Sequence, residues 1–193
     1  TLRAITDRTV KKYASPQGRG RQMNEGAAHA TGDILVFVHA DTFLPPNALS
    51  VIETILKNTQ YVGGAFSHQF QTQTPYFKIL SALATLRSQI TQAPYGDQVH
   101  FIRKTSFDAI CGYKDIPLME DVDLMRRIKK KKWKILILPD HITTSARRWE
   151  QEGYVYASLR DTVIIFLHWC GAPAEKLARF YPDQKPERQE DLE

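Results

Sequence analysis

Short apolar runs that alternate with helical segments are the feature that most constrains how this chain folds. Residues 34–38, Ile-Leu-Val-Phe-Val, form a continuous apolar run between Gly32-Asp33 and Asp41. Such a run predicts a strand that is buried on both faces. A helix is expected over 45–57, because apolar residues recur there on one stripe after two prolines. This alternation is typical of an α/β fold, so we expect a mostly parallel sheet flanked by helices.

The same pattern divides the rest of the chain into strands, helices and a tail. Further strands are expected at 61–70, 96–103 and 133–138. After a loop at 15–21, further helices are expected at 24–30, 75–92, 105–110, 120–131, 151–168 and 174–181. We predict one domain over 1–181, with a C-terminal helical part at 150–181, and a charged, disordered tail at 182–193.

Composition excludes several classes of protein. Of the 193 residues, 42% are apolar and 24% are charged, which is ordinary for a globular chain and excludes wholesale disorder. Two cysteines, Cys111 and Cys170, cannot form a disulfide framework, so a reducing compartment is expected. No signal-peptide pattern opens the chain, and no apolar run reaches about 18 residues, so we expect a cytoplasmic protein.

Polar residues follow the most apolar strand. His39-Ala40-Asp41-Thr42 comes at its carboxyl end, which is the edge where open α/β sheets bind ligands. A carboxylate such as Asp41 can hold Mg²⁺ or Mn²⁺ there, since these cations prefer oxygen ligands and also bind substrate phosphates. The alternative is a strand-end aspartate that caps a turn at Thr42.

Three carboxylates crowd the first turn of the helix expected at 120–131. Glu120, Asp121 and Asp123 are favoured there by the helix dipole alone, which is a sufficient structural explanation. Carboxylates packed this closely also repel each other, which can raise the pKa of one of them and produce a general base.

Two basic segments are candidates for binding an anion. Arg147 and Arg148 precede Trp149, and a guanidinium that stacks on a ring suits a diphosphate; a solvated arginine pair is the alternative. Residues 18–26 are not a dinucleotide fingerprint, because no third glycine and no preceding apolar strand are present. They are better interpreted as a basic loop that leads into a helix and favours anions.

Taken in order, these motifs resemble the family 2 glycosyltransferases of the GT-A fold, over roughly residues 18–181. The similarity is closest to a bacterial subgroup, the radical-SAM/selenodomain-associated glycosyltransferases. It is carried by Gly18-Arg19-Gly20-Arg21-Gln22-Met23-Asn24, His39-Ala40-Asp41-Thr42, Tyr95-Gly96-Asp97-Gln98, Pro117-Leu118-Met119-Glu120-Asp121 and Ser145-Ala146-Arg147-Arg148-Trp149. The family opens with an apolar strand and a Pro-Asn-Glu turn that this chain lacks, so we expect a GT-A-like, Rossmann-like sheet without that N-terminal strand.

The resemblance implies a role for individual residues. Asp41 matches the family's metal-binding aspartate, His39 replaces the first aspartate of that motif, and Asp121 matches the usual catalytic base. The residues implied to bind the nucleotide sugar are Asp7, Arg21, Asn24, His39, Asp97, Glu120, Arg147, Arg148 and Trp149.

The implied reaction is metal-assisted, inverting transfer of a sugar from a nucleoside diphosphate sugar to an acceptor hydroxyl. A non-catalytic or degenerate nucleotide-sugar-binding protein is the alternative. A haloacid-dehalogenase-type phosphatase is disfavoured, because His39 stands where that chemistry needs an aspartate. Nucleic acid is not an expected partner, because few aromatic residues interleave with the basic ones.

The C-terminal helix has its own alternatives. Residues 163–167 are apolar all round, which fits burial against the sheet domain, a homodimer contact or an interfacial membrane segment. A second basic segment contains Arg126, Arg127 and the four consecutive lysines 129–132. It forms either a solvated helix face or a site of attraction to anionic lipid at the inner face of the membrane.

Overall fold

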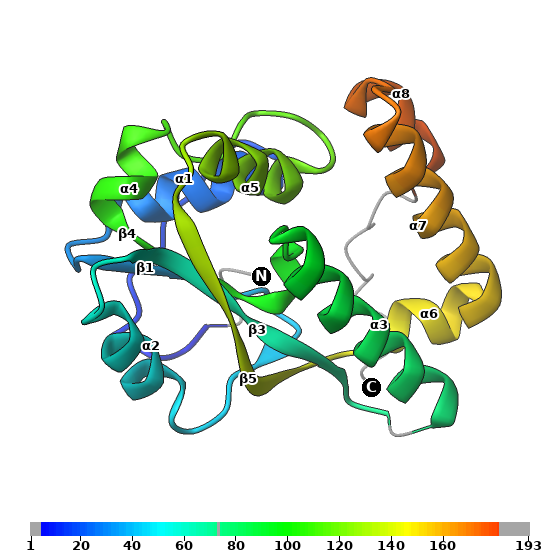
Figure 1. The fold of residues 1–193 in the computed structure, drawn as a ribbon, viewed down its shortest axis with the longest axis horizontal. Helices are drawn as coiled ribbons and strands as arrows, with labels where there is room; N and C mark the ends of the chain where they lie inside the picture. Colours follow the sequence, from blue (N-terminus) through cyan, green and yellow to red (C-terminus); the bar gives the residue numbers. More distant parts are fainter. Residues whose placement is uncertain (1–4, 73, 182–193) are drawn as a thin grey trace.

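The computed structural model describes residues 5–72 and 74–181, which form a sheet with helices on both faces (Figure 1). The sheet has five strands in the order β1-β4-β3-β5-β2. Their bounds are β1 Ile34–Phe37, β2 Thr42–Phe43, β3 Tyr61–Phe70, β4 His100–Arg103 and β5 Lys134–Thr144. The predicted strand at 61–70 is confirmed at both ends.

The sheet is mixed, which corrects the expectation of a mostly parallel one. Among the strands of the described residues, only β3 and β5 pair in parallel, while β1–β4, β4–β3 and β5–β2 are antiparallel. Alternating strands and helices predict that helices cover the sheet, but they do not determine the direction in which each strand re-enters it. β1, β3 and β5 still run the same way, so their carboxyl ends share one edge with the amino end of β4.

The helices form two layers on opposite faces of the sheet. Their bounds are α1 Arg19–His29, α2 Ala48–Leu56, α3 Pro75–Thr91, α4 Lys104–Ala109, α5 Glu120–Lys130, α6 Arg147–Glu152, α7 Tyr154–Trp169 and α8 Ala174–Leu177, with single 3₁₀ turns at Gly96–Gln98 and Ala178–Phe180. One core joins α1, α4 and α5 to the sheet through residues such as Leu35, Ile102 and Leu124. The other joins α2 to the opposite face through Phe66 and Ile142.

Two strands differ from their predicted form. β1 is one of the two edge strands of the described sheet, and only Leu35 of its four residues is buried, so the prediction of burial on both faces is wrong. β5 continues beyond Pro139, because the pairing with β3 shifts register there: Phe66 lies opposite Leu138, and Ser67 opposite His141. A bulge of this kind accommodates a proline inside a strand, since the missing N–H is not needed for pairing.

Two helices also differ. α1 begins at Arg19, five residues before the predicted start, so part of the predicted loop is helical. The helix predicted at 151–168 is two helices, since Gly153 adopts φ 84° between α6 and α7. This backbone region is unfavourable for residues with a Cβ, so glycine allows the break.

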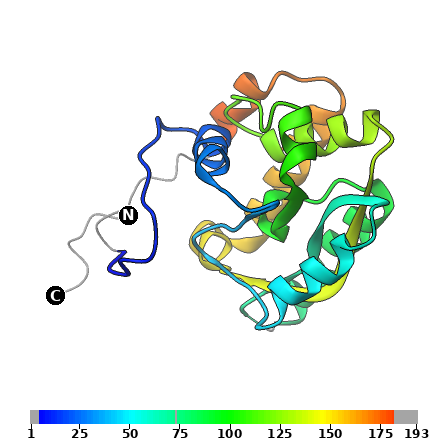
Figure 2. The ribbon, with the colours of Figure 1, turned by 90° about the vertical axis from the view of Figure 1, so that its left-hand side faces the viewer.

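The chain before α1 extends away from the sheet (Figure 2), and the described residues 5–18 contain no helix or strand. The predicted tail at 182–193 lies outside the described residues, and the division into a 1–181 domain and a tail stays a prediction.

Candidate active site

The amino end of α5 presents a buried carboxylate at the edge of the sheet where β1 ends. Asp121 is only 7% exposed, and its two oxygens accept hydrogen bonds from the backbone N–H groups of Gly96 and Val122, each at 2.7 Å. The helix begins abruptly because Met119 adopts the left-handed conformation, with φ 65°. Acidic residues are favoured in such a first turn by the helix dipole.

Gly96 is the point on which three side chains converge. A Cβ on this residue would lie 3.1 Å from His39 Nε2, 3.2 Å from Arg19 Nη2 and 3.4 Å from Asp121 Oδ2. The absence of a side chain therefore lets the Gly96 N–H approach Asp121 while His39 and Arg19 occupy the adjacent space. The end of β1 and the start of α5, about 80 residues apart in sequence, meet here.

Arg19 of α1 links the histidine to the neighbouring acid. Its Nη2 donates to His39 Nε2 at 3.1 Å, and its Nε lies 3.2 Å from Oε1 of Glu120, which is 1% exposed. Burial raises the pKa of Glu120, and the charge of Asp121 raises it further. Burial lowers the pKa of His39, and Arg19 lowers it further, so the neutral imidazole is favoured.

Asp41 lies in a tight turn between β1 and β2, where the N–H of Thr42 donates to the carbonyl of His39 at 3.1 Å. The Ser145 N–H donates to the Asp41 carbonyl at 3.2 Å, which ties the turn to the end of β5. The Asp41 side chain is exposed, and within the described residues its carboxylate has no ion pair or hydrogen bond. Asp41, Asp97 and Asp121 all act on the His39 imidazole and favour its protonated form.

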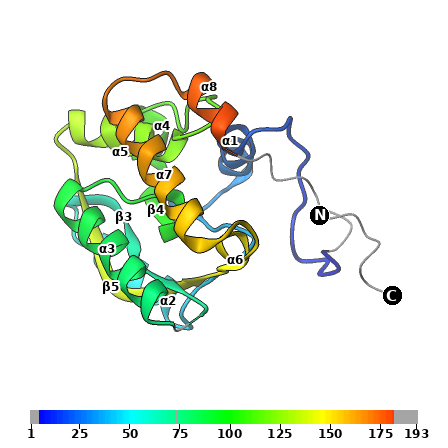
Figure 3. The same ribbon diagram turned by 90° about the vertical axis from the view of Figure 1, so that its right-hand side faces the viewer.

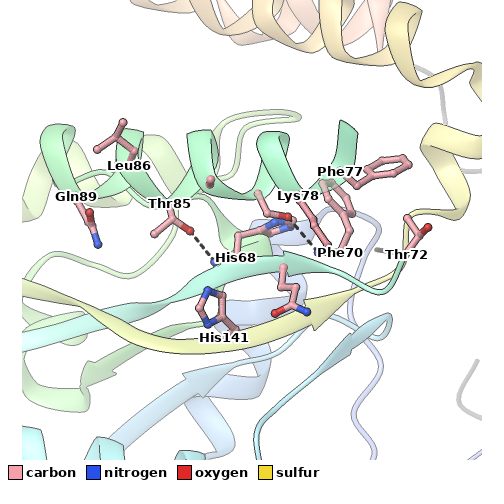
Figure 4. Close-up of a pocket in the computed structure, with 12 residues that line it drawn as sticks. His68, Phe70, Thr72, Phe77, Lys78, Thr85, Leu86, Gln89 and His141 are labelled. Atoms are coloured by element: carbon pink, nitrogen blue, oxygen red, sulfur yellow. Dashed lines mark hydrogen bonds between the residues drawn. The ribbon is translucent and has the colours of Figure 1, made fainter. Parts of the chain in front are cut away.

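His68 of β3 connects this group to a hollow beneath α3. Its Nε2 lies 3.8 Å from Asp97 Oδ2 and 3.0 Å from Thr144 Oγ1, while its buried Nδ1 has no hydrogen-bond partner among the described residues. The hollow has a volume of about 410 Å³, and Figure 4 shows His68 and His141 among the side chains that line it. Burial lowers the pKa of His68, so the ring is neutral at physiological pH.

Three predicted nucleotide-binding residues have partners elsewhere. Arg21 makes two hydrogen bonds to the exposed carboxylate of Asp115, one of them at 2.7 Å. The Asn24 amide bonds both backbone groups of Tyr113, at 2.8 and 2.9 Å, and so attaches α1 to the loop before α5. Asp7 accepts two bonds from Thr9, at 2.8 and 2.7 Å, in the segment that Figure 2 shows apart from the sheet.

The arginines after β5 form a separate corner with α7. Arg148 Nη2 donates to Asp161 at 2.9 Å, and its guanidinium lies 3.9 Å from the centre of the Trp149 ring. Trp149 Nε1 donates to Ser158 at 3.1 Å. Arg147, at the start of α6, is exposed. Arg148 and Trp149 therefore hold α6 against α7.

Sequence reasoning missed Arg19 and Gly96 as site residues. Arg19 stands in the same motif as Arg21, but residues two apart on a helix point about 200° apart, so only one of them can face the site. The start of α1 at Arg19 determines which of the two arginines faces the site, and the predicted start at residue 24 left both of them in a loop. Gly96 stands within the Tyr95-Gly96-Asp97-Gln98 motif, but no local pattern signals a close approach to a distant carboxylate.

The described residues contain no group of three His, Cys, Asp or Glu side chains placed to hold a metal ion. Mg²⁺ and Mn²⁺ are commonly bound by one or two carboxylates, with substrate phosphates and water supplying the other ligands. The exposed Asp41 carboxylate fits that kind of site. His39 fits less well as a ligand, because its Nε2 already accepts a hydrogen bond from Arg19.

Comparison with known families identifies the family of the chain. Residues 3–162 match the model of the family described as glycosyltransferase like family 2. The match covers most of the chain, so the protein belongs to this family and is a glycosyltransferase. Membership implies a nucleotide-sugar donor and an acceptor as its partners. A search of curated proteins gave no significant match.

Proposed function

We propose that the protein transfers a sugar from a nucleoside diphosphate sugar to an acceptor hydroxyl with inversion at the anomeric carbon. Asp121 is the general base in this proposal, and Asp41 binds Mg²⁺ or Mn²⁺. The motifs at 18–24 and 95–98 favour the bacterial radical-SAM/selenodomain-associated subgroup within the family.

The setting of Asp121 is the observation that carries the proposal. Its carboxylate is buried, it is oriented by two backbone N–H groups, and it has no cation partner among the described ion pairs. Each oxygen that accepts one hydrogen bond keeps a further lone pair, which can take a proton from a hydroxyl. A positioned base of this kind contributes about 10²–10⁴-fold to a rate.

The donor end of the site is assigned to the residues around the β1 and β5 ends. A divalent ion at Asp41 would neutralise charge on the departing diphosphate when bound. Arg147 is exposed directly after β5, where Ser145 contacts the Asp41 turn, so its guanidinium is the candidate for direct contact with the diphosphate.

In the proposed step, the acceptor oxygen bonds to the anomeric carbon as the bond from that carbon to the diphosphate oxygen breaks. The acceptor proton passes to Asp121, and the bonding electrons leave with the diphosphate. His39 and Glu120 both contact Arg19 beside this space. Their proposed role is to position Arg19, and neither of them exchanges a proton in this step.

Asp121→Asn tests the assignment of the base. We expect release of nucleoside diphosphate to fall at least 100-fold, while donor affinity measured by calorimetry stays within about twofold. Asp115→Asn, which removes an exposed carboxylate outside the site, is the matched control and should retain activity. Turnover retained by the Asp121→Asn variant would refute this role.

The second candidate is a protein that binds the donor without transferring the sugar. The Arg148–Asp161 pair favours it, because an arginine expected near the diphosphate is already neutralised. This candidate predicts that the wild-type chain binds nucleoside diphosphate sugars in calorimetry but releases no nucleoside diphosphate with any acceptor class offered.

A further inference from the structure

Helix α3 carries an apolar stripe on the face that points away from the protein. Ile79, Leu83, Leu86 and Ile90 are between 50% and 72% exposed. Their spacing of four, three and four residues places them on one face of the helix. The opposite face buries Phe77 and forms the contact with the sheet, so the stripe is not needed for folding.

Helix α7 carries a second stripe of the same kind. Val155, Leu159, Val163 and Phe166 are between 53% and 64% exposed, again at helical spacing. Ala157 and Ile164 are the buried residues of this helix and define the inward side. Of residues 163–167, for which burial against the sheet domain was one of three interpretations, only Ile164 is buried.

The two helices that carry the stripes lie on one side of the molecule. Figure 3 shows α3 and α7 together on the face turned to the viewer. Their amino ends are joined, since the Tyr76 hydroxyl donates to Ser158 at 2.8 Å and the rings of Tyr76 and Tyr154 are 5.0 Å apart. Groups of exposed apolar side chains mark interaction surfaces in proteins that contact a partner or a membrane.

The two helices that carry the stripes have more basic than acidic residues. Helix α3 has no acidic residue, and the only one in α7, Asp161, turns inward to Arg148 and Arg160. At the carboxyl end of α3, Lys129 Nζ donates to the Thr91 carbonyl at 3.4 Å. That contact places Lys129, the first residue of the lysine run 129–132, beside the carboxyl end of α3.

We propose that the two stripes form a docking surface for an anionic lipid bilayer. The apolar side chains enter the boundary between headgroups and acyl chains, and the lysine run contacts the headgroups. No helix in the described part of the chain is long and apolar enough to span a bilayer, so the contact is interfacial. A second copy of the chain fits less well, because a twofold contact would bring together two surfaces with more basic than acidic residues.

Vesicle flotation with the full chain tests this surface. Wild-type protein should float with vesicles of phosphatidylcholine and phosphatidylglycerol, and less with phosphatidylcholine alone or in high salt. Leu83→Gln with Leu159→Gln should weaken partitioning at least about tenfold. Lys130→Gln with Lys131→Gln should weaken binding to the anionic vesicles by about fivefold for each lysine.

Leu49→Gln is the matched control, since Leu49 of α2 is 62% exposed, the same fraction as Leu159, but belongs to neither stripe. Each variant must keep the wild-type melting transition. No flotation with anionic vesicles, or an equal loss in Leu49→Gln, overturns the proposal. A wild-type dimer in ultracentrifugation that dissociates in the Leu83→Gln, Leu159→Gln variant overturns it in favour of a second copy.

Discussion

The amino end of α5 and the corner between α6 and α7 were both expected to bind the donor, yet they are organised in different ways. At α5, Asp121 is held by backbone N–H groups and has no cation partner among the described ion pairs. At the corner, Arg148 and Arg160 are both paired with Asp161. Charge that is already neutralised inside the protein stabilises the fold, whereas uncompensated charge is available to a ligand.

The same contrast exists within α5 itself. Asp123 lies two residues after Asp121 but is bound by Lys114 at 3.1 Å and Arg127 at 2.6 Å. Hydrogen bonds from these cations lower the pKa of Asp123 against the opposing effect of burial. The helix turn therefore separates a carboxylate that only backbone groups hold from one that is paired with two cations, although one residue stands between them in the sequence.

The largest effect that can test this contrast is expected at Asp41. Asp41→Ala should weaken donor binding about 100-fold in the presence of Mn²⁺, because the proposed metal loses its protein carboxylate. The wild-type protein with a chelator should show the same loss, and the variant should not respond to Mn²⁺. Calorimetry with and without the metal measures both.

Asp33→Ala is the control for Asp41→Ala, since Asp33 is exposed at the opposite end of β1. It should bind the donor normally. Equal donor affinity of wild type and Asp41→Ala, with and without Mn²⁺, would falsify the metal assignment and leave the carboxyl edge of β1 without a role in binding.

Substitutions in the corner between α6 and α7 should change the stability of the fold rather than donor binding. Arg148→Met leaves Asp161 without one of its two cations in a setting that is 18% exposed, so we expect a loss of about 2 kcal/mol in the free energy of unfolding. Donor KM should change little. Urea denaturation and steady-state kinetics measure the two quantities. Arg147→Met should have the reverse pattern, with a raised KM and a smaller loss of stability.

A raised donor KM in Arg148→Met with unchanged stability would assign the corner to the donor site. The opposite outcome would separate two adjacent arginines into a ligand contact, Arg147, and a structural residue, Arg148.

The elements that follow from local periodicity could be predicted, and those set by long-range pairing could not. The strand at 61–70 and the helix beginning at Glu120 have strong patterns, and both were found. The direction of β4 and the two-residue β2 depend on partners far away in sequence. The sequence predicted that the last strand ends at Pro139. The strand continues because its pairing with β3 shifts register there, and such a shift leaves no local signal in the sequence.

The candidate site divides in the same way. The strand end at His39 and Asp41 and the acid pair at Glu120 and Asp121 could be singled out, because residue type and position after a strand or at a helix start carry information. Whether Arg19 or Arg21 faces them depends on the helix phase. The partner of Arg148 lies 13 residues away on another helix, and its sequence carries no sign of that pairing.

A smaller effect should distinguish Arg19 from Arg21. Arg19→Met removes the donor to His39 and the cation of buried Glu120, so we expect donor KM to rise about tenfold and stability to fall. Arg21→Met breaks only an exposed pair and should leave both quantities nearly unchanged.

The double variant Arg19→Met, Glu120→Gln separates these two effects. Removing the buried charge together with its partner should restore stability, while KM stays high if Arg19 contacts the donor region. Recovery of both would assign Arg19 a purely structural role and would remove it from the site.

The smallest expected effect concerns pH, through the buried histidines beside the site. His100 is 1% exposed; its Nε2 donates to the Pro94 carbonyl, and its Nδ1 accepts from the Tyr113 hydroxyl, each at 3.2 Å. Burial lowers the pKa of His100 and of His68 below the value of 6.5 that they regain on unfolding. The unfolded chain therefore binds more protons, so stability is present above about pH 6.5 and falls as the pH drops toward the folded-state values.

Urea midpoints measured between pH 7.5 and pH 5.5 should decrease with acid in the wild type and decrease less steeply in His100→Gln. The slope, rather than the absolute midpoint, is the readout, because loss of two buried hydrogen bonds lowers the variant's stability at every pH. His29→Gln, which alters a histidine in an exposed pair with Glu25, should keep the wild-type slope. An unchanged slope in His100→Gln would show that buried groups other than His100 cause the loss of stability in acid.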